Sequence, residues 1–350
     1  MATIGDVARR AGVARATVSH ALSGKRPVAP ETRARVLAAV QELGYQPNAA
    51  ARSLTSRRMR TVGLALPLDF YEDTLPEGPF FGFIAHAAEW LGHHDHKLLC
   101  LISRESDPAE LVRLAQSGYV DGLLLLQVRY ADPRVAPLRD AGVPFVTIGR
   151  PHDTTGLTCV DADLAAAAEM AVDHLVGLGH RRIAFLTAFH DGAPVYGFQY
   201  HALAGFERAR RLHSLCLDRD HILTYAPECG PHKVLRALID DPDGPTGLVT
   251  TTDVEAAAAV RILAAHGQSV PTDLSLVTLG DSMLMELSQP PITAVRFPVA
   301  EETRAAVDLL MDILTGAQPG CRQRIIPVEL LRRHSTRAIS DQPSAISHQP

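Results

Sequence analysis

The 350-residue sequence has no apolar run long enough to cross a membrane, and its N-terminus lacks the basic and then apolar pattern of a signal peptide. We therefore expect a cytoplasmic protein. Aromatic residues make up only 5% of the chain and apolar residues 46%, which is typical of a soluble globular protein. A chain of this length is too long for one small core, so two or three domains are expected.

Cysteines are few, and their five positions are scattered without a CxxC pair, which favours small buried or half-buried thiols. The sequence also lacks a P-loop, a G-x-S-x-G turn and an HExxH helix, which leaves an enzyme such as a sugar hydrolase or kinase as the weaker alternative. The segment GHHDH, which contains His93 to His96, lacks a separated second ligand pair. We therefore predict no metal and no cofactor, and expect Asp95 to take a left-handed turn conformation.

Positive charge is concentrated at the N-terminus. Residues 1–60 hold eleven Lys and Arg against three Asp and Glu, a net charge of +8, although the whole chain carries −5. The remainder therefore carries −13. A basic head on an acidic body is typical of a nucleic-acid-binding module joined to a second functional unit.

The head predicts three short helices. Thr3 and Asp6 form a variant capping box before an apolar helical face, and Gly12 suits the left-handed end of that helix. A second helix is expected over about 15–22. A third, over 31–43 with Pro30 in its first turn, is expected to bury Val36, Leu37, Val40 and Leu43. The first two helices and their tight turn constitute a helix-turn-helix.

The second helix has one small, polar or basic side, which in a helix-turn-helix enters the major groove of DNA. Arg15 can donate two hydrogen bonds to guanine, and Ala16 can contact a thymine methyl group. Thr17, Ser19 and the Thr3 hydroxyl can contact phosphates. A small helical subdomain with solvated charges is the alternative, but the charge asymmetry and the spacing both favour DNA.

The head resembles that of the LacI/GalR family of bacterial transcription regulators, whose pattern is T-x-x-D-V-A-x-x-A-G-V-S-x-x-T-V-S-R-x-L-N-G. The matching residues are Thr3, Asp6, Val7, Ala8, Ala11, Gly12, Val13, Thr17, Val18, Ser19, Leu22 and Gly24. The sequence departs from the pattern at Ala14, His20 and Ser23, where the family usually has Ser, Arg and Asn. Ala14 removes a helix cap worth about 1 kcal/mol, and His20 is expected to change the base preference.

The segment LGYQPNAAARSLTSRR resembles the family's hinge, in which a short helix folds only on DNA beside its twin from a second subunit. Asn48 can cap this helix, which is too short to be stable alone. The resemblance implies DNA contacts for Asn48, Ala51, Arg52 and Leu54, with Leu54 as a wedge in the minor groove.

From Thr61 onward, apolar runs alternate with helical patterns in two blocks. This alternation predicts an α/β fold with two doubly wound parallel-sheet lobes, because parallel strands need helical crossovers. Strands are expected at TVGLALP, KLLCLIS, GLLLL, FVTIG, RIAFLTA, ILTYA, GLVTTTD and LSLVTLGD. Helices are expected from about Phe80, Pro108, Asp132, Leu164, Tyr196, His232 and Val254. Ligands bind at the carboxyl ends of such strands, so two facing lobes form a cleft.

The body also resembles this family, whose core is like a periplasmic sugar-binding protein, in stretches such as GHRRIAFL, VPTDLSLV and PPIT. The resemblance implies that the chain crosses between the lobes near residues 160, 292 and 325. The expected organisation is then a helix-turn-helix domain over 1–47, a hinge over 48–60, a first lobe over 61–160 and 293–325, a second lobe over 161–292 and 326–336, and a disordered tail over 337–350.

Family members bind a small effector, often a sugar, between the lobes. The expected effector-binding residues are Phe80, Phe81, Gln127, Gln199, Tyr200, His201, Tyr225, Asp253 and Asp281. Two polar anchors of the family are replaced, an Arg by Ala202 and an Asp by Gly280. Three alternatives remain open. The ligand is held instead by Gln127, Gln199, Tyr200, His201 or Asp281, or it is not a simple sugar, or the response to an effector has been lost.

The sequence therefore predicts a homodimeric, effector-controlled repressor that binds a pseudo-palindromic DNA operator. The effector is expected to be carbohydrate-related. A plain ligand-binding carrier without a specific operator is the alternative, against which the basic head argues.

Overall fold

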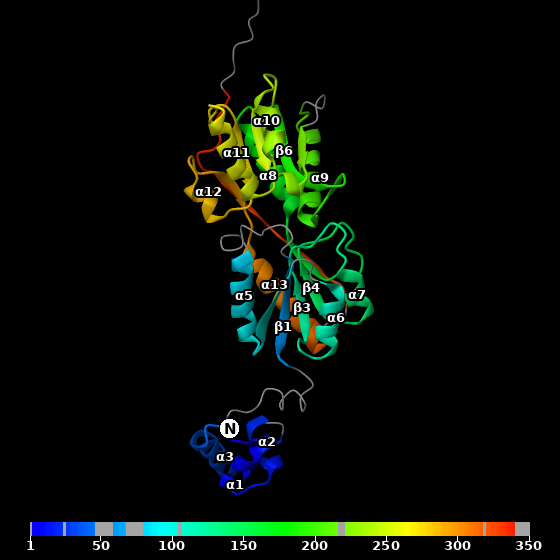
Figure 1. Ribbon diagram of the computed structural model, residues 1–350, viewed down its shortest axis with the longest axis vertical. Helices are drawn as coiled ribbons and strands as arrows, with labels where there is room; N and C mark the ends of the chain where they lie inside the picture. The colour runs from blue at the N-terminus through cyan, green and yellow to red at the C-terminus, as the bar shows by residue number, and fades with distance from the viewer. Residues whose placement is uncertain are drawn as a thin grey trace, which may run out of the picture. The chain divides into compact units, whose positions relative to one another are not determined.

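The computed structural model describes residues 2–23, 26–45, 59–67, 80–103, 107–215, 221–317 and 320–339. The chain divides into two compact units, the first ending at Met59 and the second beginning at Arg60. Figure 1 shows their helices and strands. Every helix among the described residues is too short or too polar to span a bilayer.

The first unit, called the head, contains α1 (Ile4–Ala11), α2 (Arg15–Ser23) and α3 (Pro30–Glu42). The predicted capping box is confirmed, because Asp6 N donates to Thr3 Oγ1 (3.3 Å) and Thr3 N donates to Asp6 Oδ2 (2.9 Å). Gly12 ends α1 with φ 66°, as expected for a left-handed turn. The two helices of the helix-turn-helix thus begin and end where the sequence indicates.

The head has a small core of its own, to which all three helices contribute. Its buried members are Val7, Ala8, Ala11, Val18, Ala21, Val36 and Ala39. The expected burial of Leu37 is wrong: this side chain is 46% exposed, whereas Val36 is fully buried. Successive residues of a helix point about 100° apart. Because α3 turns Val36 inward, Leu37 faces outward.

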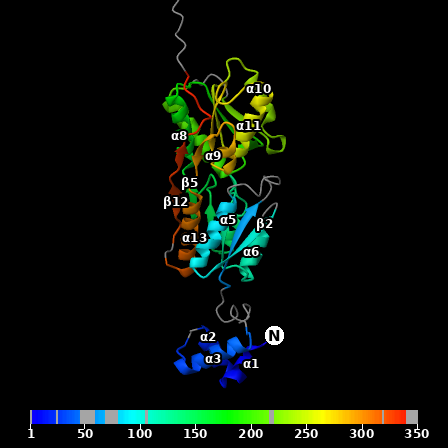
Figure 2. The same cartoon turned by 90° about the vertical axis from the view of Figure 1, so that its left-hand side faces the viewer.

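The second unit begins with a lobe built on a parallel sheet, with strand order β12-β5-β4-β3-β1-β2. Its strands are β1 (Thr61–Pro67), β2 (Lys97–Ser103), β3 (Gly122–Leu125), β4 (Phe145–Ile148), β5 (Cys159–Ala162) and β12 (Gln323–Ile326). Helices α5 (Phe80–His93) and α13 (Val299–Thr315) cover one face, and α6 (Pro108–Gln116) and α7 (Val135–Asp140) cover the other (Figures 1 and 2). Burial on both faces explains the continuous apolar strand sequences.

The second lobe has the sheet order β13-β11-β10-β9-β6-β7, with β8 beside β6. Its strands are β6 (Ile183–His190), β7 (Ala193–Pro194), β8 (Ile222–Tyr225), β9 (Gly247–Thr250), β10 (Ser275–Leu279), β11 (Thr293–Arg296) and β13 (Glu329–Leu331). Its helices are α8 (Leu164–Gly177), α9 (Gly197–Leu212), α10 (His232–Ile239), α11 (Asp253–Ala265) and α12 (Met283–Leu287), with a 3-10 turn η1 (Pro227–Cys229). The core under α8 and α9 is separate from the one under α10 and α11.

The chain passes between the lobes three times, after β5, after β11 and after β12. The second crossing differs from the expectation. Residues 293–296 form β11, which pairs with β10 in the second lobe, so the crossing follows Arg296 rather than residue 292. The first and third crossings follow Ala162 and Ile326, one or two residues beyond the expected positions.

The expected disordered tail begins too early at residue 337. Arg337 N donates to Ser275 Oγ (3.0 Å), and Ile339 N donates to Leu178 O (2.8 Å). His180 Nε2 lies 3.1 Å from Arg337 O. Residues 337–339 are therefore part of the second lobe, and the rest of the expected tail, 340–350, lies outside the described residues.

Candidate functional site

The polar side of α2 lies on the surface of the head. Arg15 and Ala16 are exposed and Thr17, Ser19 and His20 are half-buried, whereas Val18 and Ala21 face the core. The five residues expected to contact DNA on this helix therefore share its outward face. A Cβ atom at Gly5 would lie 2.8 Å from Arg15 Nη2, so the guanidinium lies directly over the start of α1.

The starts of α1 and α2 differ in capping. Thr3 Oγ1 donates to Asp6 Oδ2 (2.7 Å), and the hydrogen bonds from Thr3 lower the pKa of Asp6. At α2, Ala14 is exposed and its methyl side chain cannot accept a hydrogen bond. Only the main-chain carbonyl of Ala14 accepts, from Thr17 N (2.9 Å) and Val18 N (3.2 Å). The expected hinge contacts Asn48, Ala51, Arg52 and Leu54 lie outside the described residues.

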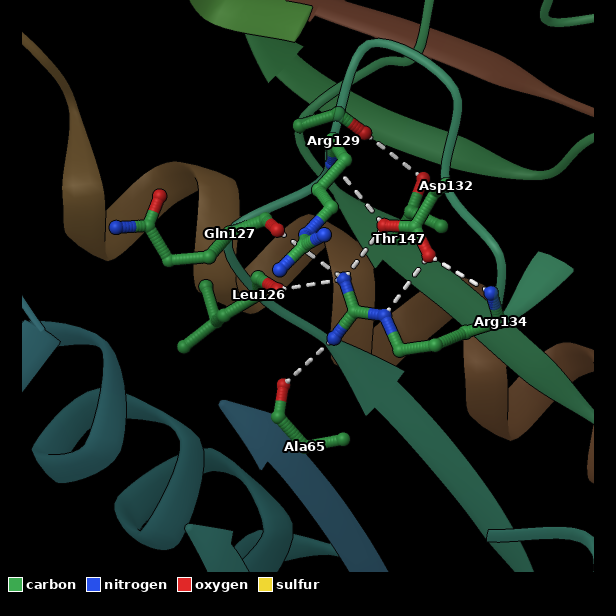
Figure 3. A network of polar contacts seen from close by, with 8 residues as sticks. Ala65, Leu126, Gln127, Arg129, Asp132, Arg134 and Thr147 are labelled. Carbon is green, nitrogen blue, oxygen red and sulfur yellow. Dashed lines mark hydrogen bonds and ion pairs between the residues drawn. The ribbon is translucent and has the colours of Figure 1, made fainter. Parts of the chain in front are cut away.

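In the second unit, the loop after β3 is held by a buried ion pair (Figure 3). Asp132 Oδ1 accepts from Arg134 N (3.0 Å) and Nε (2.9 Å), and Oδ2 accepts from Arg134 Nη2 (2.7 Å) and Arg129 N (3.0 Å). Arg134 Nη2 also donates to Leu126 O (2.9 Å) and Gln127 O (3.2 Å). The pair thus ties both ends of the loop over 126–134 together.

Burial of Asp132 opposes its ionisation, but hydrogen bonds and the charge of Arg134 outweigh burial and lower the pKa of Asp132. The side chains of Asp132 and Arg134 are 0% and 3% exposed. This network also corrects an expectation. The Asp132 carboxylate binds the side chain of Arg134 in the loop before the helix. Helix α7 begins at Val135, whereas the sequence predicted a start near Asp132. Gln127, an expected ligand residue, takes the left-handed conformation with φ 50° in the same loop.

The loop contacts the second lobe through main-chain hydrogen bonds. Gly197 N donates to Val128 O and Tyr130 N donates to Val195 O, both at 3.0 Å. Arg129 and Tyr196 form an antiparallel bridge between these bonds. We call residues 128–130 and 195–197 the interlobe bridge. It lies where β3 ends and α9 begins, that is, at the carboxyl edge where a ligand cleft is expected.

Three expected ligand residues follow the interlobe bridge on α9. Gln199 is 1% exposed, and its Oε1 accepts from Val195 N and Tyr196 N (both 2.9 Å), so this oxygen caps the helix. Tyr200 packs its ring edge-on against Tyr130 (5.1 Å between centroids). His201 Nε2 lies 3.2 Å from Pro151 O, and burial lowers the pKa of His201.

Three charged residues at the carboxyl edge of the first sheet were not foreseen from the sequence. Arg150 Nε donates to Asp161 Oδ2 (2.9 Å), and burial raises the pKa of Asp161 to about 6. Glu302, on the first turn of α13, is 4% exposed, and its Oε1 has no hydrogen-bond partner in the described structure. Burial, and then the charges of Asp161 and Glu301, raise the pKa of Glu302 to about 8. The sequence offered two signals for this cluster. Arg150 directly follows the apolar run FVTIG, and Asp161 lies inside an apolar strand.

The carboxyl edge of the second sheet has its own buried acid. Glu255 accepts from Tyr225 Oη (2.8 Å), Thr251 N (2.8 Å) and Thr252 N (2.9 Å), and burial raises the pKa of Glu255 to about 7. Tyr225, an expected aromatic wall residue, is thus oriented by Glu255. Asp253 lies beside it as the first residue of α11 and accepts from Val254 N (2.9 Å).

Asp281 is held by two arginines from distant segments. Its carboxylate accepts from Arg296 Nε (3.0 Å) and Arg333 Nη2 (2.5 Å). At the preceding position, Gly280 has φ 124°, a conformation that favours glycine over the Asp usual in the family. Ala202, at the place of the family's Arg, is 1% exposed in the core of the second lobe.

The aromatic pair at the start of α5 divides between core and surface. Phe80 packs into the core of the first lobe, and Phe81 is 69% exposed. At the other end of α5, Asp95 takes the expected left-handed conformation with φ 56°. No group of three or more metal-ligating side chains occurs among the described residues, which include His93 to His96.

Comparisons with known proteins agree with this two-unit arrangement. The model of the "Bacterial regulatory proteins, lacI family" matches residues 3–48, and the "Periplasmic binding protein-like domain" matches 172–336. The chain is 32% identical over 339 residues to the HTH-type transcriptional regulator CelR of Thermobifida fusca, covering 95% of this chain and 98% of that protein. The chain belongs to the LacI family. It is therefore a DNA-binding transcriptional regulator and not an enzyme.

Other relatives of this LacI-family regulator support the assignment. The HTH-type transcriptional repressor CytR of Escherichia coli is 31% identical over 345 residues, 97% of each chain. A CelR–cellobiose complex is 30% identical with a TM-score of 0.72 and covers 96% of this chain and all of that one. The Lac repressor dimer bound to operator and ONPF has a TM-score of 0.82 over 96% of this chain and 99% of that one; at 22% identity it shows the shared fold.

Proposed function

We propose that this regulator is a homodimeric repressor that acts in the cytoplasm on a pseudo-palindromic operator. The single observation that carries this proposal is the outward polar face of α2, which presents Arg15, Ala16, Thr17, Ser19 and His20 together on a basic head. A dimer with two such heads reads two half-sites about one helical turn apart. In this proposal Thr3 and Ala14 lie beside the phosphates, and Asn48, Ala51, Arg52 and Leu54 form the hinge contacts.

Exposed apolar side chains support the proposed self-association. Met283 and Leu287 on α12 are 75% and 70% exposed, and Val254 on α11 is 42% exposed. In the first lobe, the edge strand β2 exposes Leu99 (37%) and Ile102 (46%). Exposed apolar groups of this kind are frequent at protein–protein interfaces, and a second copy of the chain is the partner we propose.

The proposed effector is a small carbohydrate-related molecule bound between the lobes. Tyr200 and Tyr225 supply aromatic rings there, and Gln127, His201 and Asp253 supply polar groups. Because Asp281 is paired with two arginines and Ala202 is buried, the ligand would be held differently from a sugar gripped by the family's Arg and Asp. Effector binding changes the relation of the lobes and thereby the affinity for the operator, typically by 5- to 150-fold.

Selection from a random duplex library tests this function. The full chain should enrich a palindrome of two half-sites, and sugars, nucleosides and small acids are then added in turn. A ligand that changes the enrichment identifies the effector class. Absence of any enriched sequence would contradict an operator-binding repressor and favour a carrier.

Replacing Arg15 by Ala should reduce specific operator binding by about 1–3 kcal/mol and relax the preference at one base pair of each half-site. The reason is the loss of the bidentate donor at the N-terminal end of α2. Fluorescence anisotropy with operators varied at single positions measures both effects. Arg35→Ala, an exposed arginine on α3, is the control. An unchanged base preference in Arg15→Ala would exclude Arg15 from base reading.

A further inference from the structure

Gly197, the first residue of α9, touches the other lobe so closely that a side chain has no room. A Cβ atom there would lie 1.7 Å from Arg150 O and 2.7 Å from Arg150 C. Real Cβ atoms essentially never approach another atom within 3.0 Å. Since the clash is with backbone atoms, a rotamer change cannot relieve it. The lobes would have to separate at this point.

Gly205 is also tightly packed, but its close contact lies within one lobe and not between the two lobes. A Cβ at Gly205 would lie 2.1 Å from Ala165 O, but this contact joins α8 and α9 within the second lobe. Gly205 is therefore required for the packing of one lobe. At Gly197, by contrast, the three atoms nearest to an added Cβ all belong to Arg150 and Pro151 of the other lobe.

Both halves of the interlobe bridge are held rigidly within their own lobes. On the first-lobe side, the Asp132–Arg134 pair fixes the loop over 126–134 (Figure 3). On the second-lobe side, Gln199 Oε1 accepts from the N–H groups of Val195 and Tyr196 and fixes the entry to α9. Two preformed segments joined by main-chain hydrogen bonds are either paired or unpaired, which is the behaviour of a two-state element.

We propose that the interlobe bridge is the latch of the effector response, and that Gly197 is the residue that permits it to close. This inference rests on the proposed function, in which the relation of the lobes sets operator affinity. The latch lies beside the proposed effector residues Gln127, Tyr200 and His201, so a ligand there directly favours one state of the bridge. Opening and closing of the bridge then change the affinity of the head for DNA.

The first test uses the full chain with Gly197→Ala, and Gly177→Ala as the matched control. Gly177 ends α8 in the same lobe, is exposed, and has nothing within 4 Å of an added Cβ. We expect Gly197→Ala to fold with an unchanged circular dichroism spectrum. Its amides at Tyr130 and residue 197 should exchange with deuterium at least about tenfold faster than in the wild type, because both hydrogen bonds of the bridge are lost. Gly177→Ala should match the wild type.

The second test closes the latch covalently. Arg129 and Tyr196 form the non-hydrogen-bonded pair of the bridge, whose Cα atoms are about 4.5 Å apart in such pairs, within the range of a disulfide. Arg129→Cys with Tyr196→Cys, in a background with Ser at Cys100, Cys216, Cys229 and Cys321, should lock the bridge on oxidation and release it on reduction. The oxidised pair and Gly197→Ala should shift operator affinity in opposite directions, by about 5- to 150-fold.

The outcomes separate the latch from the function on which it rests. Wild-type amide protection in Gly197→Ala, or an unchanged operator affinity in both the open and the locked variants, would overturn the latch. Failure of the wild type to bind any operator would overturn the proposed function instead. Amide exchange would then still decide whether Gly197 permits the lobes to close.

Discussion

Arg134→Ala is expected to lower the free energy of unfolding by about 3–5 kcal/mol, the usual effect of removing one partner of a buried ion pair. Asp132 would be left with a carboxylate that is 0% exposed and without its guanidinium partner. The carbonyls of Leu126 and Gln127 would also lose their donor. Arg134→Lys should recover only part of the loss, because an ammonium group lacks the forked geometry that reaches these acceptors together.

Urea denaturation of Arg134→Ala, of Asp132→Ala and of the double variant measures this coupling. The double variant should be less destabilised than the sum of the two single variants, since removing both partners leaves no unpaired charge. Arg139→Ala, which removes an exposed guanidinium bonded to Thr155 O, is the control and should change stability by less than about 1 kcal/mol. A loss of that small size in Arg134→Ala would contradict the role given to the pair.

Glu302→Gln should stabilise the regulator in mildly alkaline solution and change it little near pH 5. Folding raises the pKa of Glu302 from the ordinary carboxyl value to about 8, chiefly through burial. The folded state therefore holds this proton more tightly than the unfolded state. The resulting stabilisation is complete below the ordinary carboxyl pKa and is lost as the pH rises through about 8. The neutral amide avoids that loss.

Thermal or urea unfolding between pH 5 and pH 9 gives the comparison. The rise in the pKa of Glu302 from 4.5 to about 8 corresponds to about 5 kcal/mol, so Glu302→Gln should approach a gain of that size over the wild type by pH 9. Glu110→Gln, at an exposed position in the first turn of α6 in the same lobe, is the matched control and should follow the wild type closely. Parallel pH profiles for the wild type and Glu302→Gln would show that this carboxyl ionises as freely in the folded state as in the unfolded one.

Local signals in the sequence predicted much of the fold. Thr3, Asp6 and Gly12 mark the ends of α1 by hydrogen bonds and conformation that involve only near neighbours. The apolar runs at 61–67 and 97–103 became β1 and β2 with the expected bounds. The alternation of strands and helices was sufficient for two parallel sheets. The short strand β11 was harder to place, because its membership of the second sheet depends on pairing with β10 and not on its own composition.

The arrangement of the expected ligand residues was less predictable, because several of them form hydrogen bonds with residues far away in the sequence. Asp281 is occupied by Arg333, 52 residues later, and Tyr225 is oriented by Glu255, 30 residues later. Gln199 is different, because its hydrogen bond is to a near neighbour. As the third residue of α9, it caps the helix by accepting from Tyr196 N, and a Gln at this position of a helix is a known capping signal. Val36 and Leu37 are adjacent apolar residues, as are Phe80 and Phe81, and only one residue of each pair can face the core. The structure buries Val36 and Phe80, so Leu37 and Phe81 are exposed.

The three crossings between the lobes affect the order in which the nascent chain can fold. The head is continuous and its core needs only residues up to about 45, so it can form as soon as it leaves the ribosome. Neither lobe has this freedom. The first sheet ends with β12 at 323–326, and the second with β13 at 329–331 and the segment to Ile339. Both lobes therefore remain incomplete until nearly the whole chain has been synthesised, and they are completed almost together.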